Sequence, residues 1–509
     1  MELTEMSQLQ SGPQETPDTA LRRNRLGVLG IVFFVVAAAA PLVGMTGAVP
    51  VAIVLGDGAG TPGAYLAVGL ILLVFSVGYA AMSQHVVNAG AFFAYVGRGL
   101  GVAWGVGSSF VSLLAYVAIQ LAIYGFFGVV AAGQMSAKFS INEQWYVWAL
   151  IAWALVLILS YFTVDVGAKV LGVMMILEII SLSITAIAVI AKGGGPEGLH
   201  FGASFSPSAI AAGTPGIAFA FAFASFIGFE ATAIYGEEAK DPKRAVPKAT
   251  YLAIGLITIL FAATSFAIVS GLGATHIVET VTKITSVNGT PLADPSQALL
   301  NVATTFVGSW LATVMGWLVL SSLFAGLLAF QNSAARYFFA MGRAGVLPRK
   351  LDQVNKKGAP WNASLLTGFI ALVVIVFFAV RKMDPFTQLF SWFSALAVVA
   401  IVLVEMLVCL AVIRYFRVSK TDTRLWHTLI APLLAFIGLG GGEYLLMSRF
   451  GLLAGTAPKG VDPTITSWAL NSTGWVLVLS SFVIFIAGAI IGKARQNSEN
   501  QDLVRDLVN

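Results

Sequence analysis

Charged residues are scarce in this sequence, and their scarcity indicates which solvent surrounds the folded chain. Only 10% of the 509 residues are Asp, Glu, Lys or Arg, whereas soluble domains carry about 25%. Hydrophobic residues make up 58% of the chain, and its mean hydropathy is +0.87. This composition argues against a water-soluble fold and predicts an integral membrane protein.

Cysteine and histidine are also rare. Cys409 is the single cysteine, which excludes an intrachain disulfide and a cysteine-based metal site. The histidines His85, His200, His276 and His427 are scattered without the spacing of metal ligands. No G-x-x-x-x-G-K-[ST] loop is present to cradle the phosphates of ATP, and no nucleophile is paired with a base. We therefore expect no metal, no cofactor and no enzymatic activity.

The apolar residues gather into about twelve stretches, most of which reach the roughly 20 residues that a membrane-spanning helix needs. Three of them are longer than a simple crossing and are expected to be tilted, broken or extended beyond the lipid. We predict an all-α integral membrane protein with about twelve transmembrane helices. The stretches run approximately over 26–56, 62–84, 100–133, 145–163, 168–191, 210–236, 248–273, 300–331, 362–380, 386–413, 426–448 and 471–493.

Positive charge is distributed unevenly over the loops that this division creates. If the N-terminus lies inside the cell, the inner loops and tails hold 22 of the 29 Lys and Arg residues, and the outer loops hold seven. Because positive charge is retained on the cytoplasmic side of membrane spans, we predict a multi-pass protein of the cell (plasma) membrane with both termini in the cytoplasm. The net charge of +5 then reflects topology, and no nucleic-acid partner is expected.

The segment 22–41, "RRNRLGVLGIVFFVVAAAAP", has the basic residues, apolar run and Ala-x-Ala site of a signal peptide. The residues before it are polar and acidic, however, and the apolar pattern continues past Pro41. We therefore expect this stretch to remain in the protein as its first membrane span.

Two of the stretches contain interruptions. The first includes "AAAAPLVGMTGAVP", in which Pro41 and Pro50 each remove a backbone donor. The sixth includes "SFIG" at 225–228, just before the acidic residue Glu230. Hydrocarbon satisfies no free backbone group, so an interrupted helix is tolerated only beside a cavity. Matching interruptions in the opening spans of two halves indicate a transporter binding site, although Gly and Pro are also common in membrane helices.

Three further motifs resemble those of one known family. "FIGFEATAIYGEEAKDPKRAVPKA" is similar to the sixth-span signature of the amino acid–polyamine–organocation (APC) permeases. "VVNAGAFFAYVGRGLG" resembles their segment between spans two and three, and "NSAARYFFAMGRAGVLP" resembles the segment that closes their eighth span. The motifs lie in the expected order, and the resemblance covers roughly residues 25 to 495.

The resemblance implies a five-plus-five inverted repeat, the amino-acid permease fold, with two extra C-terminal helices. It also implies alternating access around a site between spans one, three, six, eight and ten. Substrates of the family are amino acids, polyamines and related amines, and many of them move with protons. The predicted organisation is a cytoplasmic tail 1–25, a first repeat 26–191, a second repeat 210–413, spans eleven and twelve over 426–493 and a cytoplasmic tail 494–509.

Several positions depart from the family pattern. Ala89 stands where the family usually has the first of two glycines, and Ala344 replaces the Asp of the eighth-span motif. Ala224 falls where some members place a large aromatic gate, so Phe221 or Phe223 would have to serve instead. These departures leave the substrate open.

Backbone groups are the first candidates for substrate binding. The N-terminus of a half-helix presents free N–H groups and a partial positive charge, which suit a substrate carboxylate. The carbonyl groups of an unwound segment suit an ammonium group. The candidate residues are Ala40, Pro41, Leu42, Val43 and Gly44 in span one, and Phe223, Ala224, Ser225 and Gly228 in span six.

A polar stripe runs along the third span, where Ser112, Tyr116, Gln120 and Tyr124 follow one another at intervals of four residues. Residues four apart share a helix face. The stripe either lines the cavity, with Tyr116 and Gln120 contacting substrate, or joins helices by hydrogen bonds.

Acidic residues inside spans are costly and are functional candidates by default. Asp57, Glu178, Glu230, Glu405 and Glu443 fall in or near spans. Counted along a continuous helix, Glu230 lies in the cytoplasmic half near the inner gate, where some family members have a gating acid. Its alternative role is a structural hydrogen bond to span one. We expect Glu405 to be structural and Glu443 to serve packing or an interface.

Glu178 falls where certain proton-coupled relatives keep a lysine in span five. A carboxylate buried at this place could bind and release a proton during transport. Alternatively, it could hold a sodium ion together with span-one carbonyls and Ser321 or Ser322, or it could be a plain structural partner. Asn332, like these two serines, is a candidate for a cation contact or a helix contact.

The leading hypothesis is a secondary active permease for amino acids or related amines that works by alternating access and is coupled to protons. The alternatives of the same fold are a substrate/product exchanger and a sodium-coupled symporter. A channel, or a sensor without transport, is disfavoured because paired broken helices indicate an alternating site with gates.

Overall fold

The computed structural model describes residues 27–86, 92–162, 165–234, 239–287 and 289–496. Helices form the whole of its regular structure, and no strand occurs within these ranges apart from two isolated β-bridges. The predicted N-terminal tail, the departure at Ala89 and residues 497–509 of the predicted C-terminal tail lie outside the described residues.

The helices of the first half of the chain are α1 (Val28–Ala39), α2 (Pro41–Val43), η1 (Gly44–Ala48), α3 (Val49–Val51), η2 (Ala52–Asp57), η3 (Gly58–Gly60), α4 (Thr61–Ser83), α5 (Phe92–Leu100), α6 (Val102–Phe139), α7 (Trp145–Ser160), α8 (Asp165–Ala191), α9 (Phe201–Phe205) and α10 (Pro207–Ile210).

Those of the second half are α11 (Pro215–Phe226), α12 (Ala231–Ile234), α13 (Pro242–Leu272), α14 (Ile277–Thr285), α15 (Gln297–Phe306), α16 (Ser309–Arg343), η5 (Arg349–Asp352), α17 (Trp361–Val380), η6 (Pro385–Phe390), α18 (Ser391–Ser419), η7 (Trp426–Ile430), α19 (Ala431–Ser448), α20 (Phe450–Leu453) and α21 (Ser472–Gln496).

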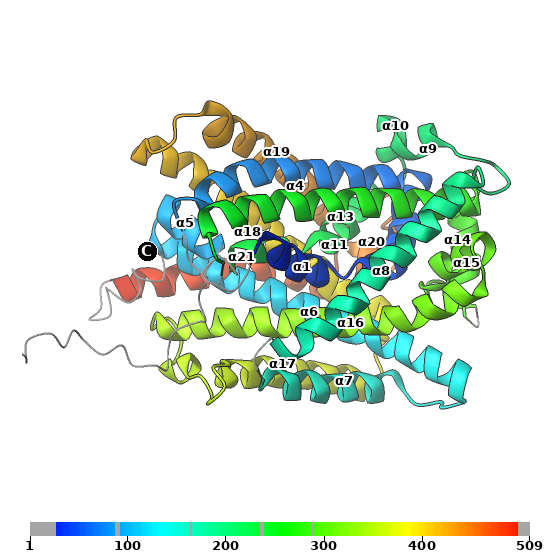
Figure 1. Cartoon of the computed structure of the whole chain (residues 1–509), viewed down its shortest axis with the longest axis horizontal. Coiled ribbons are helices and arrows are strands. Elements are labelled where there is room, and N and C mark those ends of the chain that lie inside the picture. The colour runs from blue at the N-terminus through cyan, green and yellow to red at the C-terminus, as the bar shows by residue number, and fades with distance from the viewer. Residues whose placement is uncertain (1–26, 87–91, 163–164, 235–238, 288, 497–509) are drawn as a thin grey trace, which may run out of the picture.

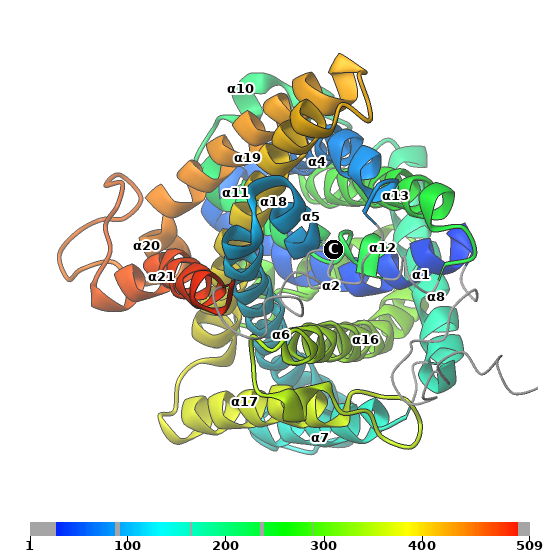
Figure 2. The ribbon, with the colours of Figure 1, turned by 90° about the vertical axis from the view of Figure 1, so that its left-hand side faces the viewer.

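The long helices run roughly side by side along the length of the molecule (Figure 1). The short helices α9, α10, α14 and α15 gather at one end, and α5 lies at the other. Seen end-on, α2, α6, α16 and α18 lie in the middle of the bundle, and α1 extends from it towards α8 (Figure 2). Helices α7 and α17 lie along the lower edge of this view, α19 along the upper edge and α21 towards the left (Figure 2). Nearly all of α11 is buried, whereas most of α21 is exposed on the outside, where lipid would cover it.

Ten segments of the described chain are long and apolar enough to cross a membrane. One of them, Val28–Ser83, covers both the first and the second predicted spans. The predicted fourth span corresponds to α7, which has 16 residues and is shorter than a usual crossing. The all-helical membrane fold is therefore confirmed, while the number twelve and the inverted repeat stay predictions.

Three predicted boundaries are wrong. The eighth stretch does not begin at residue 300, because the helix is interrupted at Gly308, whose φ of 143° favours glycine, and α15 is a separate helix before it. The helix α16 then continues to Arg343, well past residue 331. The seventh stretch begins before residue 248, because α13 begins at Pro242, a residue type suited to a first helical turn.

Candidate substrate and cation site

The first span is interrupted where it was predicted to be. Helix α1 ends at Ala39, and Ala40 takes a left-handed conformation with φ 43° and ψ 70° although it is only 4% exposed. Pro41 follows as the first residue of α2, where its missing N–H breaks no helical bond. The predicted run of bare backbone is shorter than expected, because Leu42, Val43 and Gly44 are already helical.

The sixth span unwinds slightly later than predicted. Phe223, Ala224 and Ser225 still belong to α11, which ends at Phe226. The irregular turn covers 227–230, and α12 begins at Ala231. Gly228 has a φ of 115°, a conformation that other residues rarely adopt. Because Phe223, Ala224 and Ser225 are helical, they can contact a substrate through their side chains rather than through free backbone groups.

The two interruptions touch each other. A Cβ atom placed on Gly228 would lie 2.8 Å from the Cβ of Ala38, in the last turn of α1. A Cβ atom on Gly44 would lie 3.2 Å from the hydroxyl oxygen of Ser225. Small residues are thus required where the first and sixth spans cross, and this crossing defines the candidate substrate site.

Glu230 lies on the unwound turn itself and is fully buried (0% exposed). The hydroxyl of Tyr116 donates to its Oε1 at 2.8 Å, and the backbone N–H of Gly228 donates to its Oε2 at 2.9 Å. Tyr79 donates to its backbone carbonyl at 2.9 Å. Its place near an inner gate stays a prediction. The side chains that bond to Glu230 come from the predicted spans two and three, namely Tyr79 and Tyr116, and neither comes from span one.

Aromatic rings surround this carboxylate. Tyr116 packs edge-on against Tyr337 of α16 at 5.2 Å between ring centroids and lies 6.1 Å from Phe330. Tyr79 lies 5.3 Å from Tyr95. Sequence reasoning did not single out Tyr79 or Tyr337, although Tyr337 stands within one of the three family motifs.

Glu178 of α8 is brought together with the first and eighth spans, as one of the hypotheses required. Its carboxylate is 2% exposed, accepts a hydrogen bond of 2.6 Å from Ser322 and faces the backbone N–H of Leu42 at the break. Ser321 is turned away, because its hydroxyl donates to the carbonyl of Leu318 in its own helix at 2.9 Å. Carboxylate and hydroxyl oxygens in this position can hold a proton or contribute to a site for a hard cation.

The polar stripe of span three makes a second link to span eight. Gln120 donates through Nε2 to Oε1 of Gln331 at 2.7 Å, and Gln331 donates to the carbonyl of Ser364 in α17 at 2.8 Å. Asn332, the residue predicted from the sequence, is half-buried and shows no such link within the described chain. Neighbouring residues on a helix point about 100° apart, so Gln331 makes this link while its neighbour does not. A cation or helix contact of Asn332 stays a prediction.

Ser225 is held by a residue that the sequence did not reveal. Its hydroxyl oxygen lies 3.1 Å from the hydroxyl of Tyr65 in α4 and donates to the carbonyl of Phe221 at 2.8 Å. Phe221 in turn stacks with Phe390 at 6.2 Å. Phe221 therefore faces the beginning of the predicted tenth span, where η6 ends at Phe390, and its role as an aromatic gate stays a prediction.

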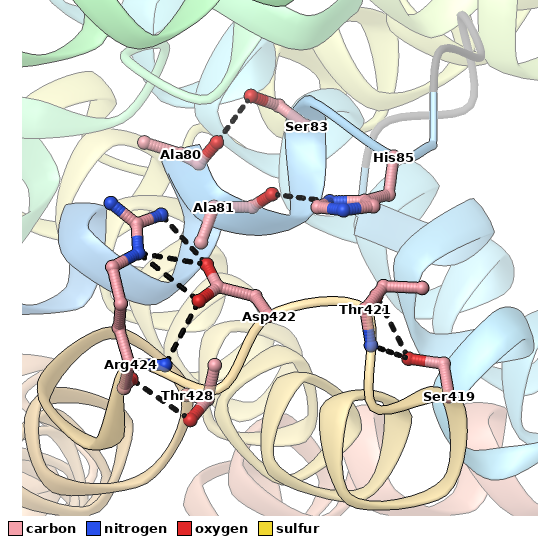
Figure 3. A network of polar contacts seen from close by, with 9 residues as sticks. All are labelled: Ala80, Ala81, Ser83, His85, Ser419, Thr421, Asp422, Arg424 and Thr428. Atoms are coloured by element: carbon pink, nitrogen blue, oxygen red, sulfur yellow. Dashed lines mark hydrogen bonds and ion pairs between the residues drawn. The ribbon is translucent and has the colours of Figure 1, made fainter.

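A polar cluster beyond α4 makes mainly local contacts. Nδ1 of His85 lies 3.1 Å from the carbonyl oxygen of Ala81 (Figure 3), and the His85 ring packs against Phe416 at 5.3 Å between centroids. Nearby, Nη2 of Arg424 lies 2.7 Å from Oδ2 of Asp422 (Figure 3). No group of three or more His, Cys, Asp and Glu side chains that could hold a metal occurs in the described part of the chain.

Comparison with known proteins gives a family match along most of the chain. The amino acid permease family model matches residues 30–495. The histidine permease of Saccharomyces cerevisiae is 28% identical over 285 residues, which are 54% of this chain and 45% of that protein. The branched-chain amino acid permease BcaP of Lactococcus lactis is 25% identical over 184 residues, 36% of this chain and 35% of that protein.

The cationic amino acid transporter 1 of Arabidopsis thaliana is 28% identical over 261 residues, 50% of this chain and 35% of that protein. In each of these three alignments the chain spans less than half the length of the relative that it matches.

Proposed function

This chain belongs to the amino acid permease family, and from that premise we propose that it carries an amino acid or a related amine across the membrane by alternating access. The family consists of permeases, so the predicted resemblance and the predicted class, a transporter rather than an enzyme, are confirmed. The observation that carries the proposal is the contact between the two interrupted helices at Ala38 and Gly228.

The proposed substrate site uses the two breaks for opposite ends of a zwitterion. A substrate carboxylate would approach the helical run that starts at Pro41, where the dipole favours negative charge. A substrate ammonium would approach the turn 227–230, whose carbonyl groups and acidic side chain favour positive charge. Tyr116 and Gln120 are proposed to line the side of this site.

The structure supports a specific role for Glu230 in this proposal. Its carboxylate accepts the hydrogen bond that the backbone N–H of Gly228 donates. This N–H is therefore not free to bind a substrate carboxylate. A substrate therefore has to be recognised at the turn chiefly through its amine, unless Glu230 first gives up this bond. We propose that binding of the amine reorganises the contacts of Glu230 with Tyr116 and thereby links occupancy to gating.

Proton coupling is assigned to Glu178. The carboxylate, Ser322 and the backbone of Leu42 belong to three elements that meet at the break of span one. When Glu178 loses its proton, the hydroxyl of Ser322 already donates a hydrogen bond to the resulting carboxylate. Glu178 therefore has a hydrogen-bond partner in both protonation states. The same oxygens could serve a sodium ion, and an exchanger would need neither ion. These remain the alternatives that the experiment separates.

The proposed topology has twelve spans in two inverted repeats of five plus two further helices, with both termini in the cytoplasm of a plasma-membrane protein. In this topology the elements from α1 to η2 form the first span, α4 forms the second, and the short helix α7 counts as the fourth. Helices α16, α18 and α21 carry basic residues in their last turns, namely Arg343, Arg417, Lys493 and Arg495. Retention of positive charge on the cytoplasmic side supports this orientation.

Uptake into proteoliposomes tests the function. We would reconstitute the purified protein and measure uptake of radiolabelled histidine, branched-chain and cationic amino acids, the classes for which the relatives are named. A preceding thermal-shift screen would select ligands, because a ligand that binds only the folded state raises its apparent stability. Saturable uptake that rises with an inward proton gradient is expected.

The Glu178→Gln variant separates the modes of coupling. It should keep substrate exchange and lose acceleration by the proton gradient. Uptake that depends on sodium, or exchange that no gradient accelerates even in the wild type, would replace the proton proposal by the corresponding alternative. Absence of uptake and of any thermal shift with every amino acid and amine tested would contradict the proposed function.

A further inference from the structure

Two buried acids lie outside the site described above. Glu405 of α18 is 2% exposed and Glu443 of α19 is 5% exposed. Among the described residues, Oε2 of Glu405 and both carboxyl oxygens of Glu443 have no hydrogen-bond partner. Buried polar groups are normally paired, so these unpaired oxygens call for a ligand that the protein chain itself does not supply.

The packing of three helices brings these acids to one place. The side-chain methyl of Met406 in α18 lies 3.3 Å from where a Cβ of Gly440 in α19 would be. Glu405 precedes Met406, and Glu443 lies about one turn beyond Gly440 on the same helix. The antiparallel helices therefore carry both carboxyl groups at nearly the same level.

Helix α11 closes the third side. The ring of Phe223 would lie 2.7 Å from a Cβ of Gly442, the neighbour of Glu443. Glu405 is within electrostatic range of both Glu443 and Glu230. The pair at the contact between α18 and α19 can therefore act on the charge of the acid at the candidate substrate site.

The charged groups that act on Glu405 are acidic. They are Glu230 on the turn after α11 and Glu443 on α19, and the thiol of Cys409 on α18 lies within the influence of Glu405. An unpaired ionised carboxylate in a membrane interior costs several kcal/mol, and neighbouring carboxylates repel each other. The pair becomes neutral only when each carboxyl group holds a proton or when other cations take the place of the protons.

A proton suits the geometry better than a metal ion. A proton needs a single oxygen, whereas hard cations such as Ca²⁺ take about six or more oxygen ligands. No cluster of three or more His, Cys, Asp and Glu side chains suitable for a metal occurs among the residues that the structure describes.

We propose that Glu405 and Glu443 form a second proton-binding site, distinct from Glu178, that sets the charge of Glu230. When both carboxyl groups of the pair are protonated, Glu230 can remain ionised and keep its bonds to Tyr116 and Gly228. When one of the two loses its proton, repulsion favours uptake of a proton by Glu230, whose carboxyl oxygen then carries the hydrogen. This inference rests on the proposed transport function for its role, but not for the existence of the site.

The test uses the variants Glu405→Gln and Glu443→Gln and their combination in the full chain. Glutamine preserves shape but cannot take up a proton in this range of pH. We expect substrate exchange without a pH gradient to persist and accumulation driven by a pH gradient to fall. The midpoint of the pH profile of uptake should move by about one pH unit, equivalent to a tenfold change in proton affinity. The control is Glu279→Gln, whose side chain is 87% exposed in α14.

Difference infrared spectroscopy of the purified protein provides a readout that needs no transport. The band of protonated carboxyl groups should titrate in the wild type and lose intensity in the double variant. This arm separates failure of the site from failure of the proposed function. If the double variant does not fold, Glu443→Asp, which keeps the acid but shortens its reach, should shift the titration rather than abolish it.

Three results would overturn the proposal. An unchanged pH profile together with an unchanged infrared band would show that the pair is not a titrating site. Loss of substrate exchange and thermal shift in a folded variant would assign the acids to the substrate site instead. Loss of a sodium-dependent activity, with no change in proton dependence, would identify a metal-cation site.

Discussion

The hydroxyl of Tyr116 donates a hydrogen bond of 2.8 Å to Oε1 of Glu230 and so joins the long helix α6 to the turn that interrupts the sixth span. Both residues are buried, and the other carboxyl oxygen is held by the N–H of Gly228. A single side chain from span three therefore fixes the acid that stands beside the candidate site.

Tyr116→Phe should impair transport more than folding. The change leaves the ring packing against Tyr337 but removes a donor to a buried carboxylate, a loss of about 1–3 kcal/mol. We expect uptake to fall about tenfold or more, since 1.4 kcal/mol is tenfold, as measured in proteoliposomes. Tyr444→Phe, at an exposed site on α19, serves as the control. Wild-type uptake by the Tyr116 variant would contradict a functional role for this bond.

Gly228→Ala should destabilise the protein. A non-glycine residue in a left-handed conformation costs about 1–2 kcal/mol, and the new methyl would also press on Ala38 at 2.8 Å. The measurement is thermal unfolding in detergent. Gly255→Ala is a matched control in α13, because its Cβ would meet no atom within 4 Å and alanine is the better helix former. Equal melting temperatures for the two variants would show that the turn tolerates a side chain.

The adjacent serines of α16 offer a matched pair. Ser322→Ala removes the donor to Glu178, whereas Ser321→Ala removes only a bond within the helix. We expect the first variant to change the dependence of uptake on the proton gradient and the second to behave like the wild type. The measurement is uptake at a series of external pH values. Identical pH profiles for both variants would show that the contact between Ser322 and Glu178 plays no part in proton coupling.

The two amides at 331 and 332 should differ in the same way. Gln331→Ala breaks the bridge from Gln120 to Ser364 and strands buried polar groups, at a cost of about 1–3 kcal/mol. Asn332→Ala touches no bond of this bridge. Unfolding by denaturant or heat should therefore show a loss of stability in the Gln331 variant and little change in the Asn332 variant. The reverse order of stabilities would show that the bridge is unimportant.

The loop before η7 gives a prediction about pH. The guanidinium of Arg424 hydrogen-bonds Asp422 and lowers the pKa of its carboxyl from 3.8 to about 2 (Figure 3). Because the folded-state pKa lies below the ordinary value, this pair contributes stability above pH 3.8 and loses it as the pH falls towards 2. The pair is partly exposed, so the contribution should be small. Asp422→Asn should flatten that part of the profile of thermal stability against pH, and an unaltered slope would argue against the pair.

The interruptions could be predicted from the sequence because proline and glycine act locally. Pro41 and Gly228 indicate the breaks without any knowledge of their neighbours in space. An acidic residue within an apolar stretch can be recognised in the same way. The meeting of Glu178 with Ser322 followed from family resemblance rather than from periodicity. These are features that a short stretch of chain or a known pattern carries by itself.

The remaining parts of the site depend on contacts between distant segments. Tyr79 reaches Glu230 across 151 positions of the sequence, and Gln120 reaches Gln331 across 211. No periodicity within one helix reveals such a partner. The link made by Gln331 shows the limit clearly, because a helix rotated by one residue presents a different amide from Asn332. A residue count along a straight helix likewise does not show that Glu230 lies on an unwound turn.

The contact between Ala38 and Gly228 also has a mechanical meaning. Helices α1 and α12 lie together (Figure 2), each joined to its other half only through an irregular point. In the proposed transport cycle, a tilt of α1 would press on the turn that leads into α12, so we expect these two segments to move together while α11 and the segment after Pro41 stay in place. Opening towards one side of the membrane would then require one hinged motion rather than two independent ones.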